Sequence, residues 1–175
     1  MATLGGLVFV AEVAVGPVTK FIASQDIGLF TAFSVFVDYY LYLILPLSVV
    51  LFYKQLGRKR IASLVLSLLL LFLLVTYTKL LFHESRPCNE YLKVSCPADY
   101  AFPSGHTAVA FAFAFFALGT AAFPFYYTSA FFVALSRIYL GVHSVNDVVG
   151  GVVVGIFSYF ISEKVVEAWL RYAGD

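Results

Sequence analysis

Predominantly apolar stretches recur along the chain and alternate with short segments of polar and turn-forming residues. These stretches cover roughly residues 37–53, 61–82, 105–122, 125–142 and 146–166. Each approaches the ~20 apolar residues that a helix needs to cross a bilayer, so the pattern predicts five transmembrane helices. A membrane β-barrel would show segments of about ten residues with alternating polarity, which this pattern lacks. We therefore expect an all-α, polytopic bundle of transmembrane helices.

Residues 1–36 carry a weaker version of the same pattern. The stretch LGGLVFVAEVAVGPV is short and contains Glu12 and Pro17, and DIGLFTAFSVFV is shorter still. We expect one of the two to span the membrane and the other to lie at its surface, which brings the total to about six helices. No segment has the composition of an appended soluble domain. Residues 1–175 are therefore expected to form a single membrane-embedded domain.

The composition agrees with a protein that has the bilayer as its solvent. Hydrophobic residues make up 62% of the 175 residues and charged residues 12%, against roughly 45–50% and about 25% in soluble domains. A formal net charge of +1 gives no basis for binding nucleic acid, which requires a basic patch or stripe. Because charges are so few, each one has to be interpreted individually.

Basic residues between the apolar stretches predict how the chain is oriented. Four fall in one connection and two near the C-terminal end, on the same side by the helix count: Lys54, Arg58, Lys59, Arg60, Lys164 and Arg171. The positive-inside rule makes this side cytoplasmic in a multi-pass protein of the cell membrane. The loop 83–104 and the region around His143 then face outward.

Both cysteines fall in that outer loop, in the stretch RPCNEYLKVSCP. An extracytoplasmic location would allow a disulfide between Cys88 and Cys96, and two unpaired thiols are the alternative. The sequence alone does not decide between them.

Three clusters of ionisable and small polar residues lie within or at the ends of the predicted transmembrane helices. They are Lys79, His83 and Arg86; the stretch Pro103-Ser104-Gly105-His106; and Arg137, His143 and Asp147. A charge at the bilayer centre costs ~2.5–3.5 kcal/mol on insertion scales, so such residues usually serve a function. The predicted topology brings all three clusters to the outer face, where they can form one site. His83 has no evident role there, and we expect it to be structural or supporting.

Five of these residues predict a binding site for an anion. Lys79, Arg86 and Arg137 supply three cations, and a guanidinium group matches the oxygens of a phosphate. Ser104 and Gly105 stand where the next helix is expected to start, and there free backbone N–H groups and the helix dipole attract anions. Glycine also lets the backbone approach its ligand closely.

The other two histidines and the aspartate suggest a reaction at that anion. If a helix begins around Ser144, Asp147 can accept an N–H bond from His143, which leaves the other ring nitrogen free to attack as a nucleophile. His106 is then the group that protonates the leaving oxygen and later activates water. Separately, each of these motifs is common on ordinary protein surfaces, and only their convergence on one face points to catalysis.

The three segments together resemble the signature of the type 2 phosphatidic acid phosphatase (PAP2) superfamily. That signature is a lysine followed after six residues by Arg-Pro, then Pro-Ser-Gly-His, then Ser-Arg followed after five residues by a histidine and after three more residues by an aspartate. Here it runs from Lys79 to Arg86-Pro87, through Pro103-Ser104-Gly105-His106, and from Ser136-Arg137 to His143 and Asp147, with no departure. The flanking apolar stretches are similar to the six-helix membrane core of that family.

The resemblance implies a metal-independent, cofactor-free phosphatase that works through a phosphohistidine. His143 would be the nucleophile, Asp147 its orienting partner and His106 the acid and base. The phosphoryl group would be held by Lys79, Arg86, Ser104, Gly105 and Arg137. Soluble relatives of the family include vanadium haloperoxidases, but a membrane core favours a lipid substrate. No carboxylate cluster suited to magnesium is evident near the signature.

Three functions remain open at this point. The favoured one is hydrolysis of a lipid phosphomonoester or pyrophosphate, with a polyprenyl pyrophosphate carrier of undecaprenyl or dolichyl type preferred over phosphatidate or phosphatidylglycerophosphate. The preference is modest, and it follows from the near-minimal chain and the outward-facing site. A lipid phosphate transporter or flippase would use the same cations but would leave the histidines unexplained. A structural membrane protein would explain none of the charges. The oligomeric state and the preferred lipid chain cannot be inferred from the sequence.

Overall fold

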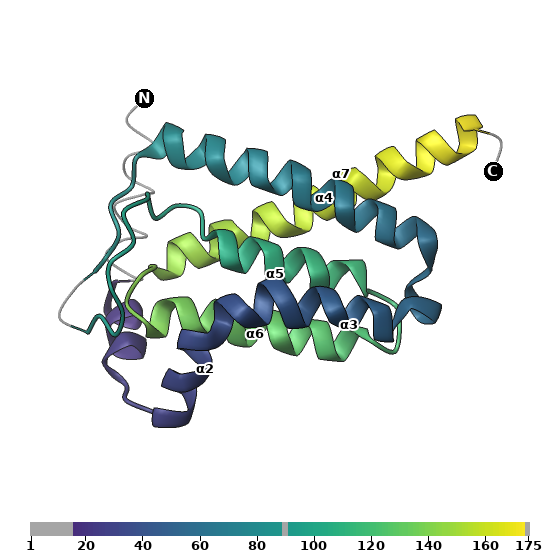
Figure 1. Cartoon of the computed structure of the whole chain (residues 1–175). Coiled ribbons are helices and arrows are strands. Elements are labelled where there is room, and N and C mark those ends of the chain that lie inside the picture. Colours follow the sequence, from purple (N-terminus) through teal and green to yellow (C-terminus); the bar gives the residue numbers. More distant parts are fainter. Residues whose placement is uncertain (1–15, 89–90, 174–175) are drawn as a thin grey trace.

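A computed structural model describes residues 16–88 and 91–173, and within these ranges all regular structure is helical (Figure 1). Residues 16–24 are helical and precede the named elements. These are α2 (Gly28–Tyr39), η1 (Tyr40–Ile44), α3 (Leu45–Leu51), α4 (Tyr53–Phe82), α5 (Gly105–Phe116), α6 (Phe123–Tyr139) and α7 (Val145–Ala173). The predicted all-α fold is confirmed, whereas most of the N-terminal stretch around Glu12 lies outside the described residues.

The first long span is built from α2, η1 and α3 in succession. It runs over Gly28–Leu51, so the short stretch 26–37 and the predicted span 37–53 are one membrane-length segment and not two. In its middle η1 is a π-helical turn, in which the N–H of Leu45 donates to the carbonyl of Tyr40. Pro46 lies one residue further on. Because proline has no N–H and clashes with the preceding helical turn, it accounts for this local widening.

Helix α4 is 30 residues long and contains a break at Gly57, whose φ of 74° is outside the helical range. Because α4 already begins at Tyr53, the predicted connection that carries Lys54, Arg58, Lys59 and Arg60 is helical except at Gly57. A left-handed φ favours glycine because it has no Cβ, and this one residue lets the chain turn into the long part of α4. The far end at Phe82 agrees with the predicted span 61–82.

Helices α5 and α6 are shorter than the apolar stretches that predicted them. α5 has 12 residues, because the chain leaves the helix at Ala117 and turns through Gly119, which has a φ of 75°. α6 has 17 residues and covers Phe123–Tyr139, so it ends before residue 142. Among the described residues, three segments are long and apolar enough to cross a membrane: Gly28–Leu51, Tyr53–Phe82 and Val145–Ala173. Of the five predicted spans, three are thus confirmed as helices of membrane-spanning length, whereas the stretch 105–122 forms the shorter apolar helix α5 and the stretch 125–142 forms the 17-residue α6.

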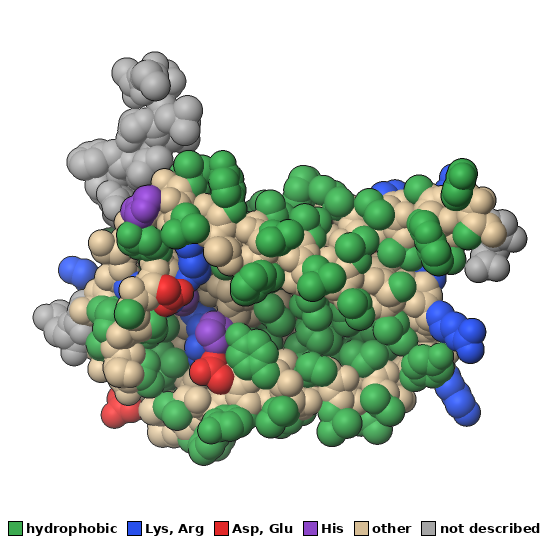
Figure 2. All heavy atoms as spheres, turned by 45° about the horizontal axis from the view of Figure 1, so that its top comes forward, with side chains coloured by type: hydrophobic (Ala, Val, Ile, Leu, Met, Phe, Trp, Pro, Cys, Tyr) green, Lys and Arg blue, Asp and Glu red, His purple; other side chains and the backbone are tan. Residues whose placement is uncertain are grey.

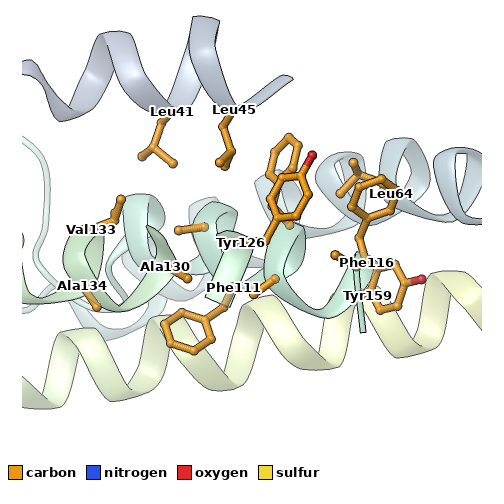
Figure 3. Close-up of a cluster of buried hydrophobic side chains, with 14 of the residues drawn as sticks. Leu41, Leu45, Leu64, Phe111, Phe116, Tyr126, Ala130, Val133, Ala134 and Tyr159 are labelled. Atoms are coloured by element: carbon orange, nitrogen blue, oxygen red, sulfur yellow. The ribbon is translucent and has the colours of Figure 1, made fainter. Parts of the chain in front are cut away.

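The short helix α5 lies at the centre of the bundle and packs against α4, α6 and α7 (Figure 1). Its buried side chains join a core that also contains Leu41, Leu64, Tyr126 and Tyr159 from the surrounding helices (Figure 3). Since the neighbours cover it, α5 does not need to reach both membrane surfaces.

Two glycines of α7 set how closely that helix approaches α5. A Cβ on Gly151 would meet the backbone carbonyl of Ser104, and a Cβ on Gly155 would meet that of Ala108. Small residues at helix contacts allow such close backbone approach in membrane proteins. The start of α5 is thereby held directly against the first turns of α7.

The outer surface of the bundle is apolar, and the charges gather at its two ends. Large side chains such as Leu29, Leu51 and Phe72 are exposed, and Figure 2 shows hydrophobic side chains covering the middle of the molecule. Acidic, basic and histidine side chains surround a hollow near one end, and basic side chains lie at the other (Figure 2). Soluble monomers do not expose apolar surface on this scale, so the middle of the bundle faces lipid.

We predict that Gly155→Val destabilises the bundle, because the added side chain would have to displace the α5 backbone at Ala108. Overpacking of this kind typically costs ~1–3 kcal/mol. Thermal unfolding in detergent should show a lower Tm for Gly155→Val and little change for the control Gly28→Ala, since nothing lies within 4 Å of a Cβ at Gly28. Equal Tm values for both variants would contradict the close α5–α7 contact.

Candidate active site

The three predicted clusters meet in one pocket at the end of the bundle where α4 ends and α5 and α7 begin. The pocket has a volume of about 710 Å³ and is lined at its charged end by Lys79, Arg86, His106, Arg137 and His143. These residues come from α4, from the loop after it, from the first turn of α5, from α6 and from the turn before α7. Residues that are up to 64 positions apart in the sequence thus surround one cavity.

The residues of the first cluster, Lys79, His83 and Arg86, do not lie on one continuous helix. The helix ends at Phe82, and His83 has a left-handed backbone with a φ of 50°. Arg86 therefore reaches the pocket from an extended segment, and Lys79 from the last turn of α4. The His83 ring packs edge-on against Tyr100 at 4.7 Å and is not part of the pocket lining, as expected for a structural residue.

The loop between α4 and α5 is fixed at two points. A disulfide joins Cys88 and Cys96, with a Cα–Cα distance of 5.9 Å. Lys93 donates to the carbonyls of Ala23 and Tyr139, and its ammonium lies 4.3 Å from the centre of the Tyr139 ring. These contacts hold the loop against residues 16–24 and α6, and so support the segment that carries Arg86.

Arg86 is the most highly connected cation of the site. Its NH1 group lies 3.0 Å from the carbonyl oxygen of Val142 and 3.0 Å from Nε2 of His143. Its Nε and NH2 groups donate to the carbonyl and the carboxylate of Asp99, at 2.9 and 2.7 Å. One guanidinium group therefore connects the loop, the Asp99 segment and the histidine predicted to be the nucleophile.

Asp99 is a site residue that the sequence did not reveal. Its carboxylate bridges Lys79, at 2.5 Å, and Arg86, which are two of the three cations predicted to bind phosphate. Partial burial would raise the pKa of Asp99, but the hydrogen bonds and charges of Lys79 and Arg86 outweigh it and lower that pKa to about 2. The carboxylate is thus ionised at physiological pH and lies against cations that a phosphate would need.

Ser104 and Gly105 lie at the start of α5, as predicted. The N–H of Ser104 donates to the carbonyl of Asp147 at 2.9 Å, and its hydroxyl accepts from Thr107 at 3.0 Å. Ser104 is completely buried and is not part of the pocket lining, whereas Gly105 is. In this structure Ser104 joins α5 to α7, and Gly105 presents the helix start to the cavity.

His143 and Asp147 form the pair that the spacing predicted. The His143 Nδ1 atom lies 3.3 Å from Oδ2 of Asp147, which also accepts the N–H of Ser144 at 2.7 Å. Asp147 is fully buried in the first turn of α7, and His143 is 2% exposed. Nε2 is the ring nitrogen that faces Arg86 and the pocket.

The surroundings of His143 favour the neutral ring. Desolvation, together with the charges of Arg86 and Lys79, lowers the pKa of His143 to about 4, against the opposing effect of Asp147. A neutral imidazole has a lone pair on one nitrogen, so at neutral pH His143 can act as a nucleophile without first losing a proton.

His106 has a carboxylate partner that was also missed at the sequence level. Its Nε2 atom lies 2.5 Å from Oδ1 of Asp38, a residue of α2. The same Oδ1 atom is 3.8 Å from Arg137, whose other donors reach the carbonyl of Ser34 and the hydroxyl of Ser136. An aspartate inside an apolar stretch is itself a signal of function, and on that rule Asp38 could have been identified.

Beyond its charged end the pocket continues between helices as an apolar groove. Its walls come from η1 and α3, from α4 and from α5, namely Leu41, Tyr42, Pro46, Leu68, Leu71, Phe72, Val75, Val109 and Phe113. The pocket therefore has a charged head and an apolar tail, a shape suited to an amphiphile. Among the described residues, no three His, Cys, Asp or Glu side chains come together as metal ligands.

Fold and site define a helical membrane protein with a pocket in which cations and histidines meet at the head of an apolar groove. The family model of the PAP2 superfamily matches residues 60–171, more than half of the chain. The chain therefore belongs to the PAP2 superfamily, whose phosphatases generally work without a metal ion. The resemblance inferred from the signature is thereby confirmed.

One curated relative and one solved structure each match most of the chain. Undecaprenyl-diphosphatase of Sulfolobus acidocaldarius is 29% identical over 139 residues, covering 71% of this chain and 64% of that protein. The chain thus spans somewhat less than two thirds of the length of this curated relative. The crystal structure of Aquifex aeolicus LpxE superimposes with a TM-score of 0.73 at 26% identity, over 86% of this chain and 95% of that one.

A second solved structure shares the fold at lower sequence identity. It is the first transmembrane PAP2-type phosphatidylglycerolphosphate phosphatase from Bacillus subtilis, with a TM-score of 0.71 and 21% identity. The match covers 91% of this chain and 87% of that one. The arrangement of helices described above is therefore that of a membrane-embedded PAP2 core.

We predict that Asp99→Asn increases the affinity of the pocket for inorganic phosphate or vanadate, because the carboxylate that competes for Lys79 and Arg86 is removed. The side chain of Asp99 is 58% exposed, so the expected gain is about three- to tenfold, corresponding to ~1 kcal/mol. Isothermal titration calorimetry can measure it, with Asp26→Asn as a control that removes an exposed carboxylate outside the pocket. An unchanged or lower affinity would show that Asp99 does not compete with the anion.

Proposed function

We propose that this protein is an integral membrane phosphatase that hydrolyses a lipid phosphomonoester or pyrophosphate through a phosphohistidine on His143. The observation that carries the proposal is the position of His143 Nε2, which lies 3.0 Å from Arg86. Lys79, Arg137 and His106 line the same pocket, which continues as an apolar groove. A lipid phosphate has the matching shape, with an anionic head and an apolar tail.

The first chemical step forms the phosphoenzyme. The lone pair of His143 Nε2 attacks phosphorus while the bond from phosphorus to the leaving oxygen breaks, and His106 gives that oxygen a proton. Asp147 accepts the Nδ1–H of His143 and stabilises the positive charge that develops on the ring. In the structure Arg86 NH1 lies beside Nε2, so an incoming phosphoryl group would take over this donor as it reaches the nucleophile.

The second step releases inorganic phosphate. His106, now neutral, takes a proton from water, and the resulting hydroxide attacks phosphorus while the bond to Nε2 breaks. Lys79, Arg86, Arg137 and the N–H groups at the start of α5 are the donors that would stabilise the equatorial oxygens in both steps. Fixed cations of this kind supply the charge that a metal ion supplies in other phosphatases.

Among lipid phosphates we favour a polyprenyl pyrophosphate of undecaprenyl or dolichyl type. The support is the similarity to a protein named undecaprenyl-diphosphatase and the apolar groove, which can accept a long tail. Phosphatidate and phosphatidylglycerophosphate are the alternatives, because the fold is shared with a phosphatidylglycerolphosphate phosphatase. A transporter or flippase would need the cations but gives no role to the His143–Asp147 pair or to His106.

We further propose that the pocket opens at the extracytoplasmic face of the cell membrane. Basic side chains lie at the opposite end of the bundle (Figure 2), where the positive-inside rule requires them for a cytoplasmic surface. The disulfide of the loop beside the pocket supports the same orientation, because disulfides persist outside the cytoplasm.

The central test is phosphate release by purified protein in excess chelator, with farnesyl or undecaprenyl pyrophosphate as substrate. We expect turnover without added metal, and we expect His143→Ala to abolish both turnover and labelling of the enzyme by ³²P-substrate. His106→Ala should slow turnover severely, by on the order of 10²–10⁴-fold, yet it should still be phosphorylated by an aryl phosphate with a good leaving group.

Mass spectrometry of the acid-labile phosphoenzyme identifies the modified residue. His83→Ala is the matched control, since this histidine lies outside the pocket lining, and it should retain activity. Phosphate on His106, or turnover without any phosphoenzyme, would refute the assigned roles. Activity that required magnesium would refute the metal-free mechanism.

Orientation can be tested by thiol labelling of intact cells or sealed vesicles. After reduction, Cys88 and Cys96 should react with a membrane-impermeant maleimide added from outside. An added cysteine at Arg58, in a variant that lacks the two native cysteines, should react only after the membrane is opened. The reverse pattern would place the pocket at the cytoplasmic face.

A further inference from the structure

Asp38 and His106 form a pair that joins α2 to the first turn of α5. The pair links residues 68 positions apart, with 2.5 Å between Oδ1 and Nε2. The side chain of Asp38 is 60% exposed and that of His106 28% exposed, and both line the pocket. Asp38 lies outside the signature that extends from Lys79 to Asp147, so that pattern gives it no role.

Most of the other charges around His106 are positive. Arg137 of α6 lies 3.8 Å from the same Asp38 oxygen, and Lys79 and Arg86 line the same cavity. The remaining titratable groups of the pocket are Asp99, which is engaged by Lys79 and Arg86, His143, and Tyr42 of η1, whose ring stands edge-on to His106 at 6.2 Å.

The contact with Asp38 fixes the ring of His106. A general acid must hold its ring in line with the leaving oxygen, because the proton moves only over a short, aligned contact. Among the described residues, Asp38 is the carboxylate in direct contact with His106. Its bond to Nε2 therefore sets the orientation of the ring in the pocket.

We propose that Asp38 is a positioning residue for His106, holding its ring in the orientation needed for transfer of a proton to the leaving oxygen. The inference rests on the proposed function, in which His106 is the acid and base. Asp38 remains ionised throughout. In the first step the proton passes from the ring of His106 to the leaving oxygen as the P–O bond breaks and the bond to His143 forms; in the second step the neutral ring accepts a proton from water.

A role of Asp38 as a partner of Arg137 alone would have a different effect on the kinetics. If Asp38 served only as the counterion of the buried Arg137, its loss would disturb phosphate binding, and substrates would be affected regardless of their leaving group. If it acts through His106, the effect depends on the leaving group, because only a poor leaving group needs the proton. The rate of phosphoenzyme formation with two substrates separates these cases.

The experiment measures single-turnover phosphorylation of wild type and Asp38→Asn with an alkyl phosphate and with 4-nitrophenyl phosphate. We expect the rate with the alkyl phosphate to fall by about 10–100-fold, and the rate with the aryl phosphate to stay within about threefold of wild type. Asp38→Glu, which keeps the carboxylate, should restore part of the alkyl rate. Asp26→Asn, which removes an exposed carboxylate outside the pocket, should match wild type with both substrates.

A double-mutant cycle tests whether Asp38 acts through the histidine. In the His106→Ala background, Asp38→Asn should cause no further loss with the alkyl phosphate, since the group it positions is already gone. Equal losses with both substrates, no loss with either, or full additivity in the cycle would each overturn the proposal. Because Asp38 is mostly exposed, the Asn variant should fold, and Asp38→Glu gives an independent comparison if its yield is low.

Failure of this inference is distinguishable from failure of the proposed function. If wild-type protein forms no phosphohistidine with any lipid, alkyl or aryl phosphate, the proposed function is wrong and the role of Asp38 falls with it. If wild type forms phosphohistidine on His143 while Asp38→Asn behaves like Asp26→Asn, the inference alone is wrong.

Discussion

The close contact between α5 and α7 is the constraint on which the rest of the site depends. Gly151 and Gly155 let α7 approach the α5 backbone, and the N–H of Ser104 donates to the carbonyl of Asp147. Both helices begin at this contact. His106 in the first turn of α5 and the His143–Asp147 pair at the start of α7 are thereby held at one cavity, at helix ends whose dipoles favour an anion.

Three carboxylates then balance the positive charge that this geometry gathers. Asp147 is buried behind His143, Asp99 bridges Lys79 and Arg86, and Asp38 contacts His106 and Arg137. The three differ in exposure: Asp147 is fully buried, whereas the side chains of Asp99 and Asp38 are 58% and 60% exposed. A buried carboxylate held by a backbone N–H, such as Asp147, is fixed. Asp99 is exposed and occupies two cations of the pocket, so it is the carboxylate that we predict a phosphate must displace.

The sequence was sufficient where the determining interactions are local. Apolar runs predicted the long helices, and the starts of α5 and α7 followed from Gly105 and the residues after His143. It failed where the determining contact is distant, as for Asp99, which is identified by its partners on the facing segments. Asp38 had a local signal, a charge inside an apolar stretch, but its partner His106 lies on another helix and could not be inferred. The end of α5 also had a local signal, the glycine at position 119. The break at Gly57 was a local signal that went unused.

If the substrate is the lipid phosphate that we propose, the division of the pocket into a charged head and an apolar groove limits where substrate selectivity can arise. A lipid tail that leaves the bilayer for a groove lined by Leu71, Phe72 and Phe113 exchanges one hydrocarbon environment for another, so little hydrophobic free energy is gained. Tail contacts can align the substrate but discriminate weakly between chains of similar thickness. Discrimination must then come mainly from the head, where a monophosphate and a pyrophosphate differ in charge and in the number of oxygens that Lys79 and Arg86 can contact. A narrow set of head groups combined with a broad set of tails is the specificity that this geometry favours.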